Sequence, residues 1–351
     1  MLFEESDLLK ALPEQFFAGL VAKVNAKVAE GADVINLGQG NPDQPTYDHI
    51  VESLCFSAKN PASHKYSQFR GNRPFKEAAA SFYEKHYGVN LDAEREICVM
   101  GGAKIGLVEL PLALMNPGDL LLLPDPGYPD YLSGVSLGRV AYETFLLTAK
   151  NDFLPDLDAI PEETARRAKF IYINYPNNPT GAVATKAFYE KLVAWAKTYE
   201  VGVVSDLAFA AGNARMIEAL NLIQDHLFVG IFPALQEAGI AALLDPKSEE
   251  AVAQLNAVYD SRRDAFTQSA AKIGWQAFPS KGSFYAWMPV PEGYTSESFA
   301  DLLLEKAHVA VAPGKGFGPA GDAYVRIGLL VEPERLVEAV DRIANLHLFN
   351  N

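Results

Sequence analysis

Positive charge, cysteine and long apolar runs are all scarce in this 351-residue sequence. Its 44 Asp and Glu residues outnumber its 30 Lys and Arg residues, and the net charge of −14 disfavours nucleic acid and anionic membranes as partners. No run of about eighteen apolar residues occurs, so we expect no membrane span. The two cysteines, Cys55 and Cys98, cannot form a disulfide framework and are typical of small core residues in a cytoplasmic protein.

Motifs for metal, nucleotide and serine-hydrolase chemistry are also missing. The six histidines show no metal-ligand spacing and no Cys-x-x-Cys occurs, so we expect no metal site. Residues 101–107 lack both the Gly-Lys-Ser/Thr of a Walker loop and the glycine spacing of a dinucleotide fingerprint. Residues 134–138 fit Gly-x-Ser-x-Gly, but the predicted helix precedes the predicted strand, which is the reverse of a nucleophile elbow. The acidic N-terminus, residues 1–7, does not resemble a secretory or mitochondrial signal.

The most informative feature that is present is a polar loop, Asn174-Tyr-Pro-Asn-Asn-Pro-Thr-Gly181, directly after the apolar run 169–173. The run reads as a buried strand, and the two prolines restrict the loop so that Asn178 is held at the strand's carboxyl end. A second apolar strand, 201–206, brings Asp206 to the same edge, where open α/β sheets bind their ligands. An amide and a carboxylate at neighbouring strand ends can clamp a flat polar ring.

Two glycine-containing turns are further candidates for ligand contact. Gly40 lies in a loop that follows a short strand, where it lets the backbone approach a ligand closely, although a plain surface turn would use the same residues. Gly102, Ala103 and Lys104 open a helix after the strand 96–100, and free N–H groups at a helix N-terminus attract anions. The alternative for this second turn is a simple strand-to-helix connection.

Three single side chains also stand out, each with a structural alternative. Tyr128 is fixed at a strand end between proline and glycine residues, where it can stack on a ring or pack in the core. Arg326 lies within an apolar strand, and a buried arginine needs an anion, which is either a ligand or an internal ion-pair partner. Tyr66 precedes a helix and alone would be a core or rim aromatic residue.

The length of the chain predicts two domains rather than one core. Residues 45–245 alternate strands and helices, which is typical of an α/β domain with a mostly parallel sheet, and Thr185 is the predicted N-cap of a helix that ends at Tyr199. Residues 1–44 and 246–351 are predicted to form a smaller α+β domain. We also expect one long helical region over 215–244 and a short strand at 275–278.

Asn-Pro-Thr-Gly at 178–181, followed by a strand that ends in Ser205-Asp206, resembles the class I aminotransferases, which are pyridoxal-phosphate enzymes of fold type I. The resemblance covers nearly the whole chain. It implies a large α/β/α domain with a mostly parallel sheet, a smaller α+β domain, an amino acid and a 2-oxo acid as substrates, and a homodimer. It also implies cofactor-binding roles for Asp206 at the pyridine nitrogen, Asn178 at the ring hydroxyl, Tyr128 over the ring face, Gly102, Ala103 and Lys104 at the phosphate, and Tyr66 at the partner's phosphate.

On the substrate side, the resemblance implies that Gly40, Asn178 and Arg326 bind the substrate, with Arg326 on its α-carboxylate and the Gly40 loop over that carboxylate. Residues 12–18 and 36–45 most resemble the methionine-salvage branch, whose members aminate a methylthio-substituted oxo acid. The aromatic residues Tyr285 and Phe317 would suit such an apolar side chain.

One part of the family pattern is absent. In the family, the strand with the aspartate leads after several dozen residues to a lysine that forms a Schiff base with the cofactor and to an arginine that grips its phosphate. Here residues 204–213 pass directly into the helix near 214, so both residues and two strands are missing, and we assign no catalytic lysine. Phe209 also replaces the family's tyrosine near the cofactor hydroxyl.

Two explanations of this missing segment stay open. The chain is a shortened homologue that binds ligand or cofactor without a Schiff base, or the natural protein contains a segment that this sequence lacks. The second explanation predicts a Cα–Cα step longer than about 3.8 Å between Asp206 and Arg215, and an open slot beside the strand of Asp206. Lys104, Lys281 and Lys315 are the lysines nearest the expected cleft, and we expect none of them to act as a substitute.

Overall fold

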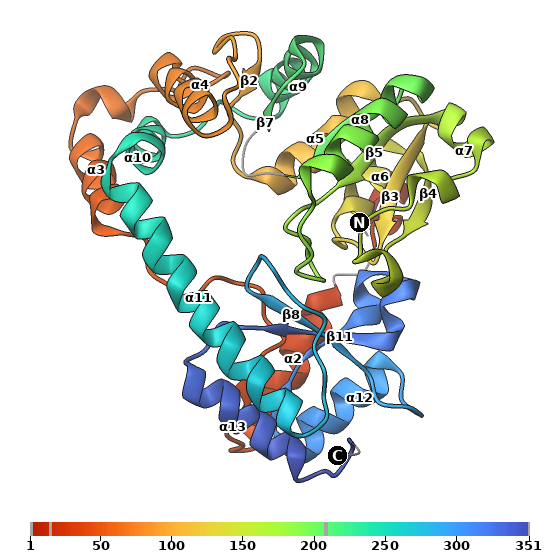
Figure 1. Cartoon of the computed structure of the whole chain (residues 1–351). Helices are drawn as coiled ribbons and strands as arrows, with labels where there is room; N and C mark the ends of the chain where they lie inside the picture. Colours follow the sequence, from red (N-terminus) through yellow and green to blue (C-terminus); the bar gives the residue numbers. More distant parts are fainter. Residues whose placement is uncertain (1–2, 14–15, 207–209, 350–351) are drawn as a thin grey trace.

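The computed structural model describes residues 3–13, 16–206 and 210–349. Figure 1 shows three groups of elements: a sheet covered by helices, a mostly helical group, and a lower group that contains the C-terminus. The 26-residue helix α11 (Lys247–Lys272) runs from the helical group down along the lower group. The boundaries near residues 44 and 245 stay a prediction.

The main sheet has four strands in the order β4-β3-β5-β6. All three neighbouring pairs are parallel, which confirms the expected parallel α/β sheet. Every residue of the central strand β3 is buried, because helices cover both faces of the sheet. The elements of this group are β3 (Leu120–Asp125), β4 (Ala141–Leu146), β5 (Ala168–Ile173), β6 (Gly202–Ser205), α5 (Ala103–Leu114), α6 (Tyr131–Gly138), α7 (Glu162–Arg167) and α8 (Lys186–Tyr199).

Helix α8 begins where the sequence predicts. Thr185 is extended and its Oγ1 accepts a hydrogen bond from the Phe188 N–H at 3.2 Å, so the expected N-cap is confirmed. The Gly-x-Ser-x-Gly run lies inside α6, and Ser136 therefore has a helical residue on each side rather than the sharp turn of a nucleophile elbow.

The helical group contains the greatest difference from expectation. Instead of one helical region over 215–244, the chain forms α9 and α10 with a break at residues 228–232. Pro233 lacks an N–H and forces Phe232 into an extended conformation, so a new helix must start there. The elements are α3 (Asp48–Ala58), α4 (Arg73–Tyr87), β2 (Ile97–Cys98), β7 (Ala210–Ala211), α9 (Ala214–Leu227) and α10 (Pro233–Leu244).

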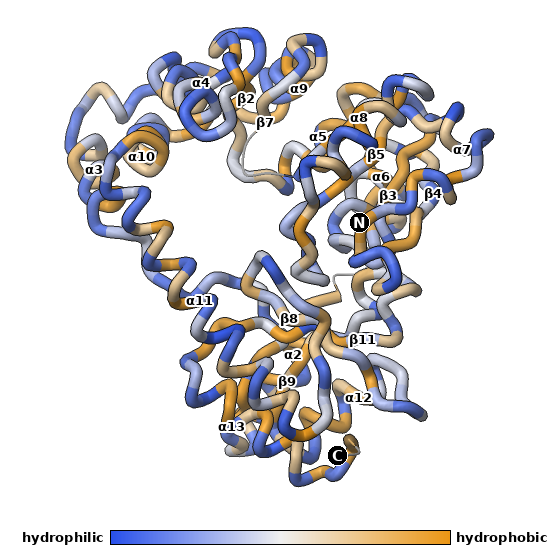
Figure 2. The backbone as a smooth tube through the Cα atoms, viewed as in Figure 1, coloured by the Kyte–Doolittle hydropathy of each residue, from blue (hydrophilic) through white to orange (hydrophobic). Residues whose placement is uncertain are grey.

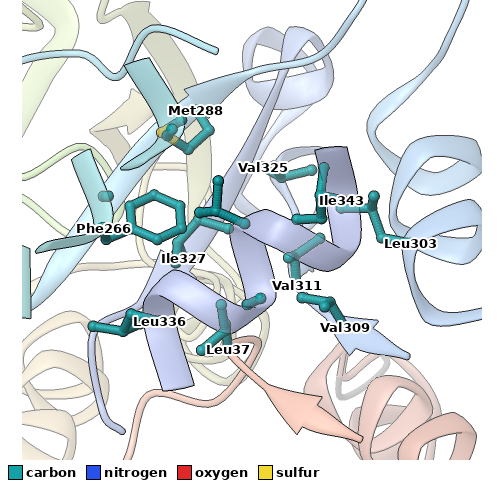
Figure 3. Close-up of a cluster of buried hydrophobic side chains, with 14 of the residues drawn as sticks. Leu37, Phe266, Met288, Leu303, Val309, Val311, Val325, Ile327, Leu336 and Ile343 are labelled. Atoms are coloured by element: carbon teal, nitrogen blue, oxygen red, sulfur yellow. The ribbon is translucent and has the colours of Figure 1, made fainter. Parts of the chain in front are cut away.

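The lower group has a three-stranded antiparallel sheet in the order β10-β11-β8 and a parallel pair β1-β9. Its core is built from apolar residues of both sheets and of the covering helices, including Ile327, Phe266 and Leu336 (Figure 3). The elements are β1 (Ile35–Asn36), β8 (Tyr285–Pro289), β9 (Val309–Ala310), β10 (Ala312–Pro313), β11 (Tyr324–Gly328), α2 (Phe16–Ala29), α12 (Ser296–Leu302) and α13 (Pro333–Ala344).

The expected strand at 275–278 does not form. Its apolar pattern has another cause, because Trp275 is buried in this core and its indole N–H donates to the Pro289 carbonyl at 2.8 Å. Short helical turns complete the described chain at α1 (Asp7–Lys10), η1 (Pro61–His64), η2 (Ala149–Asn151), η3 (Leu157–Ala159), η4 (Leu303–Ala307), η5 (Gly314–Phe317) and η6 (Pro319–Ala323).

Strand β6 is the last strand of the main sheet. Within the described residues it pairs with β5 alone, whereas β7 pairs with β2 in a separate antiparallel ribbon. Val203 and Val204 are only half-buried. The Cα steps through residues 207–209, and with them the position of Phe209, lie outside the described residues.

Candidate functional site

Asp206 directly follows β6, and its N–H donates to the Ile173 carbonyl at 3.0 Å, which continues the β5–β6 ladder. Its carboxylate accepts one hydrogen bond, at 3.1 Å, from the Tyr131 hydroxyl. Burial raises the pKa of Asp206, and the Tyr131 hydrogen bond opposes this shift. A partly desolvated carboxylate with one neutral donor still has room to accept a charged N–H group.

The loop after β5 is built by its own asparagine side chains. The Asn174 side-chain carbonyl accepts from the Asn178 N–H at 2.8 Å, and the Asn177 side chain accepts from Thr180. Gly181 has a φ of +70°, and a Cβ at this position would clash with Ser280, so a glycine is needed here. The loop is therefore rigid, and it holds the Asn178 side chain toward β11.

Arg326, in the middle of β11, reaches that loop. Its Nη1 donates to Asn178 Oδ1 at 2.9 Å and its Nη2 donates to the Gly38 carbonyl at 3.4 Å. The residue is 2% exposed, and burial lowers the pKa of its guanidinium to about 10. Its Nε–H has no hydrogen-bond partner in the part of the chain that the structure describes.

The internal ion pair that the sequence left open for Arg326 does not occur within the described residues. Instead, three aromatic rings surround the guanidinium, with their centroids 5.2, 4.1 and 4.7 Å from its Cζ: Phe17, Tyr285 and Phe317. Cation–π contacts favour the charge but cannot replace a carboxylate. A buried cation with an unpartnered donor and no carboxylate partner among the described residues can accommodate an external anion.

Gly40 borders the same guanidinium. Its carbonyl accepts from the Tyr285 hydroxyl at 3.3 Å. A Cβ at Gly40 would lie 2.7 Å from the Tyr285 hydroxyl and 3.2 Å from Arg326 Nη2. Any side chain here would therefore enter the space beside the guanidinium, which explains why this position carries a glycine.

The helix α5 begins close to the same strand edge. Gly102 is its N-cap, with a φ of 128° and no side-chain cap, so the first N–H groups of the helix are open to an anion. The Lys104 ammonium forms an ion pair with Asp130 at 2.8 Å. Lys104 is half-exposed, so this pair constrains the ammonium weakly and an arriving phosphate can compete for it.

Tyr128 is half-buried and packs edge-on against the ring of Tyr131, with the centroids 5.6 Å apart. Burial raises the pKa of its hydroxyl, so the ring is neutral at physiological pH. Tyr131 thus contacts both Tyr128 and Asp206. Sequence reasoning missed Tyr131 and Asp130, although their positions in the first turn after Tyr128 were a usable signal.

Tyr66 is the predicted site residue that stands apart. It lies in the helical group and is 87% exposed. No hydrogen bond joins its side chain to the Asn178–Asp206 edge of its own described chain. The other predicted residues gather around the carboxyl ends of β3, β5 and β6 and around β11.

A cavity of about 60 Å³ borders the free side of β6. It is lined by residues of α5, β6, β7 and α9, including Gly106, Val204, Asp206 and Leu220. No helix in residues 3–13, 16–206 and 210–349 has the length and apolar character needed to cross a membrane. The same ranges contain no cluster of three or more His, Cys, Asp or Glu residues suited to a metal ion.

Comparison with known proteins gives consistent matches. The family model described as aminotransferase class I and II matches residues 32–212 and 207–343. L-glutamine–4-(methylsulfanyl)-2-oxobutanoate aminotransferase of Bacillus subtilis is 51% identical over 391 residues, which cover 99% of this chain and 98% of that protein. The LL-diaminopimelate aminotransferase of Aquifex aeolicus is 40% identical, over 99% of this chain and 100% of that protein. The structure of apo-BacF from Bacillus subtilis matches with a TM-score of 0.93 and 40% identity over the full length of both chains.

These matches contain one discontinuity. The alignment of 391 residues is 40 longer than the 351-residue chain, so at least 40 positions of the relative have no counterpart here. The family model also matches in two pieces that meet at residues 207–212. The discontinuity therefore falls directly after Asp206, next to the free side of β6.

Proposed function

This chain belongs to the class I and II aminotransferase family and has its fold type I architecture, and on this premise we propose that it transfers an amino group from glutamine to a methylthio-substituted 2-oxo acid. The observation that carries the proposal is Arg326, a buried guanidinium without a carboxylate partner among the described residues. Such a group suits the α-carboxylate that every amino acid and 2-oxo acid presents.

The family uses pyridoxal phosphate, and the described residues fit this group. Asp206 would accept a hydrogen bond from the protonated pyridine nitrogen, Asn178 would hold the ring hydroxyl, and Tyr128 would cover the ring. The N-terminus of α5 would hold the phosphate, through the backbone at Gly102 and Ala103 and the ammonium of Lys104. When bound, the cofactor supplies an electron-accepting ring that stabilises negative charge at the substrate's α-carbon.

Asp206 has the right electrostatic setting for this role. Because burial raises its pKa, its carboxylate is stabilised by a nearby positive charge more than an exposed one would be. A charged pyridinium N–H would supply that charge, and the hydrogen bond from Tyr131 orients one carboxylate oxygen. Asp206 would in turn favour the protonated form of the ring nitrogen.

The residues around Arg326 support the choice of oxo acid. Arg326 and the backbone at Gly40 would hold the α-carboxylate, while Phe17, Tyr285 and Phe317 form an apolar wall around them. A thioether side chain packs well against aromatic rings. The name of the relative that is 51% identical gives both the glutamine donor and the 4-(methylsulfanyl)-2-oxobutanoate acceptor for that protein.

A homodimer would complete the site by bringing Tyr66 of one copy to the cofactor phosphate of the other. Tyr66 is 87% exposed, so its side chain is free to reach the site of a partner copy. Figure 2 shows many apolar residues on α10, and α3 and α10 carry exposed apolar side chains, namely Val51, Phe56, Leu235 and Leu244. We propose a cytoplasmic homodimer without nucleic-acid or membrane partners.

A second candidate function is a shortened homologue that binds ligand or cofactor without catalysis. The discontinuity after Asp206 favours it, since at least 40 positions of the relative are missing here. Lys104 lies in α5 and Lys315 in η5, so neither lies beyond Asp206, where the family carries its Schiff-base lysine. The two candidates differ in whether a lysine bonds the cofactor covalently.

One experiment separates the two candidates. The purified chain is mixed with pyridoxal phosphate, and its visible absorbance is recorded before and after borohydride, alongside a glutamine-to-oxo-acid transamination assay. An active aminotransferase shows a borohydride-sensitive band and turnover. Binding of the cofactor without either signal supports the shortened homologue. Absence of cofactor binding would refute the cofactor site, provided that circular dichroism shows a folded protein.

A further inference from the structure

The segment Gly38–Asp43 lies between two buried arginines of the lower group. Arg326 contacts its beginning, through the Gly38 carbonyl. Arg262, from α11, contacts its end through two hydrogen bonds to the Asp43 carboxylate, at 2.9 Å from Nη1 and 3.0 Å from Nη2. The Gly40 backbone that borders the Arg326 guanidinium belongs to this segment.

Arg262 differs from Arg326 in its partners and not in its burial. It is 1% exposed, and its charge is met by two carboxylates, Asp43 and Glu332, the latter at 2.9 Å. The Asp43 carboxylate also accepts from the Tyr259 hydroxyl at 3.4 Å. A planar fork that binds both oxygens of one carboxylate fixes the orientation of that carboxylate as well as its distance.

The segment is also held at its start and in its middle. The Leu37 N–H donates to the Ala310 carbonyl at 2.8 Å, and the Leu37 carbonyl accepts from the Gly328 N–H at 2.6 Å, so the start is part of the sheet structure. The Tyr285 hydroxyl then holds the Gly40 carbonyl. Asp43 is the charged anchor at the far end, three residues beyond Gly40.

We propose that Arg262 is a positioning residue for substrate-carboxylate binding, because it holds Asp43 and thereby keeps the Gly40 backbone against Arg326. The proposal rests on the proposed function in one respect, namely that the ligand is the carboxylate of an amino acid or 2-oxo acid. Arg262 itself does not touch that ligand. The two arginines differ in their counter-charges: Asp43 and Glu332 meet the charge of Arg262, whereas no carboxylate among the described residues meets that of Arg326, although the Nε–H of each is unpartnered there.

The test measures binding of 4-(methylsulfanyl)-2-oxobutanoate to the full chain without cofactor, by isothermal titration calorimetry or saturation-transfer NMR. The variants are Asp43→Asn, which removes the charge of the anchor, and Arg262→Lys, which keeps the charge but loses the fork. The matched control is Glu332→Gln, because Glu332 binds the same guanidinium but lies outside the segment. We expect about tenfold or greater weakening for the first two variants, since small displacements in binding geometry have large effects, and less than about twofold for the control.

A second measurement distinguishes positioning from general damage. The affinity for pyridoxal phosphate, followed by fluorescence, is expected to stay unchanged in all three variants, because within the described residues Asp43, Arg262 and Glu332 form no hydrogen bond with any proposed cofactor residue. Equal oxo-acid affinity in folded Asp43→Asn and wild-type protein overturns the proposal. Loss of cofactor and oxo-acid binding together also overturns it, because it shows a general structural effect. If the wild-type chain itself binds no oxo acid, both this inference and the substrate part of the proposed function are wrong.

Discussion

Arg326 and Arg262 form a natural pair for one stability experiment, because they are equally buried but differ in their counter-charges. For Arg326, a pKa lowered from 12.5 to about 10 corresponds to roughly 3 kcal/mol of unfavourable burial of the charged form. Because the folded-state pKa lies below the unfolded-state pKa, this cost is fully present at every pH below about 10, and therefore at pH 7.

Replacing Arg326 with methionine removes this cost together with the hydrogen bonds to Asn178 and Gly38, each worth about 1 kcal/mol. We therefore expect Arg326→Met to have a free energy of unfolding within about 1 kcal/mol of the wild type, or higher. Arg262→Met leaves Asp43 and Glu332 without their cation. Since both carboxylates are partly exposed, we discount the cost of breaking a buried pair and expect a loss of about 2–3 kcal/mol.

The assay is urea unfolding at pH 7 and 25 °C, followed by far-UV circular dichroism. A second series adds 4-(methylsulfanyl)-2-oxobutanoate, which should raise the midpoint of the wild type but not that of Arg326→Met. If Arg326→Met loses as much stability as Arg262→Met, then the Arg326 charge is compensated within the protein. The assignment of Arg326 as a carboxylate receptor would then be refuted.

Three further outcomes are expected. Asp206→Ala should weaken pyridoxal phosphate binding at least tenfold with little change in melting temperature. Burial raises the pKa of Asp206 above the usual aspartate value of 3.8. As the pH is lowered, the wild-type protein should therefore begin to lose affinity for the cofactor above that value. Tyr131→Phe should move that loss to higher pH, and fluorescence titration at several pH values measures both effects. Gly181→Ala should lower the free energy of urea unfolding by about 1–3 kcal/mol. The double variant with Ser280→Ala should recover only the part due to the Ser280 Oγ, because the Ser280 Cβ would still lie 2.8 Å from the new Cβ. Sedimentation equilibrium at micromolar concentration should show a dimer, and a folded monomer would contradict the proposed role of Tyr66.

The sequence predicted those features that are set by local chemistry. Thr185 was correctly predicted as an N-cap because its side chain satisfies a nearby backbone N–H group. The break before Pro233 was missed, although the proline itself was the signal, because the apolar pattern continues on both sides of it. Trp275 was assigned to a strand because a buried segment without strand pairing shows the same apolar sequence pattern as a buried β-strand.

Arg262 shows what sequence reading of the site lacked. Next to Arg263, it looks like one of two surface charges on a helix. The structure separates them: Arg263 pairs with Asp260 and Asp264 near the surface, while Arg262 is buried. The signal for the burial of Arg262 was its spacing of four residues from Phe266, which places both on one face of the helix. Asp43, the partner of Arg262, is 219 residues away in the sequence. No local pattern joins them.

The two halves of the candidate site depend differently on the missing positions. The proposed substrate-binding residues are Arg326, Asn178 and the Gly38–Asp43 segment, and Arg326 contacts both of the others directly. Asp206 stands at the end of β6, which is paired with β5 alone within the described residues, and the alignment discontinuity lies immediately beyond it. An edge strand leaves one row of backbone groups unpaired, so β6, which precedes Asp206, is the less protected part of the site. If Arg326 and Asp206 act as proposed, carboxylate binding does not depend on covalent cofactor chemistry, and the same geometry predicts a chain that binds the oxo acid without turning it over.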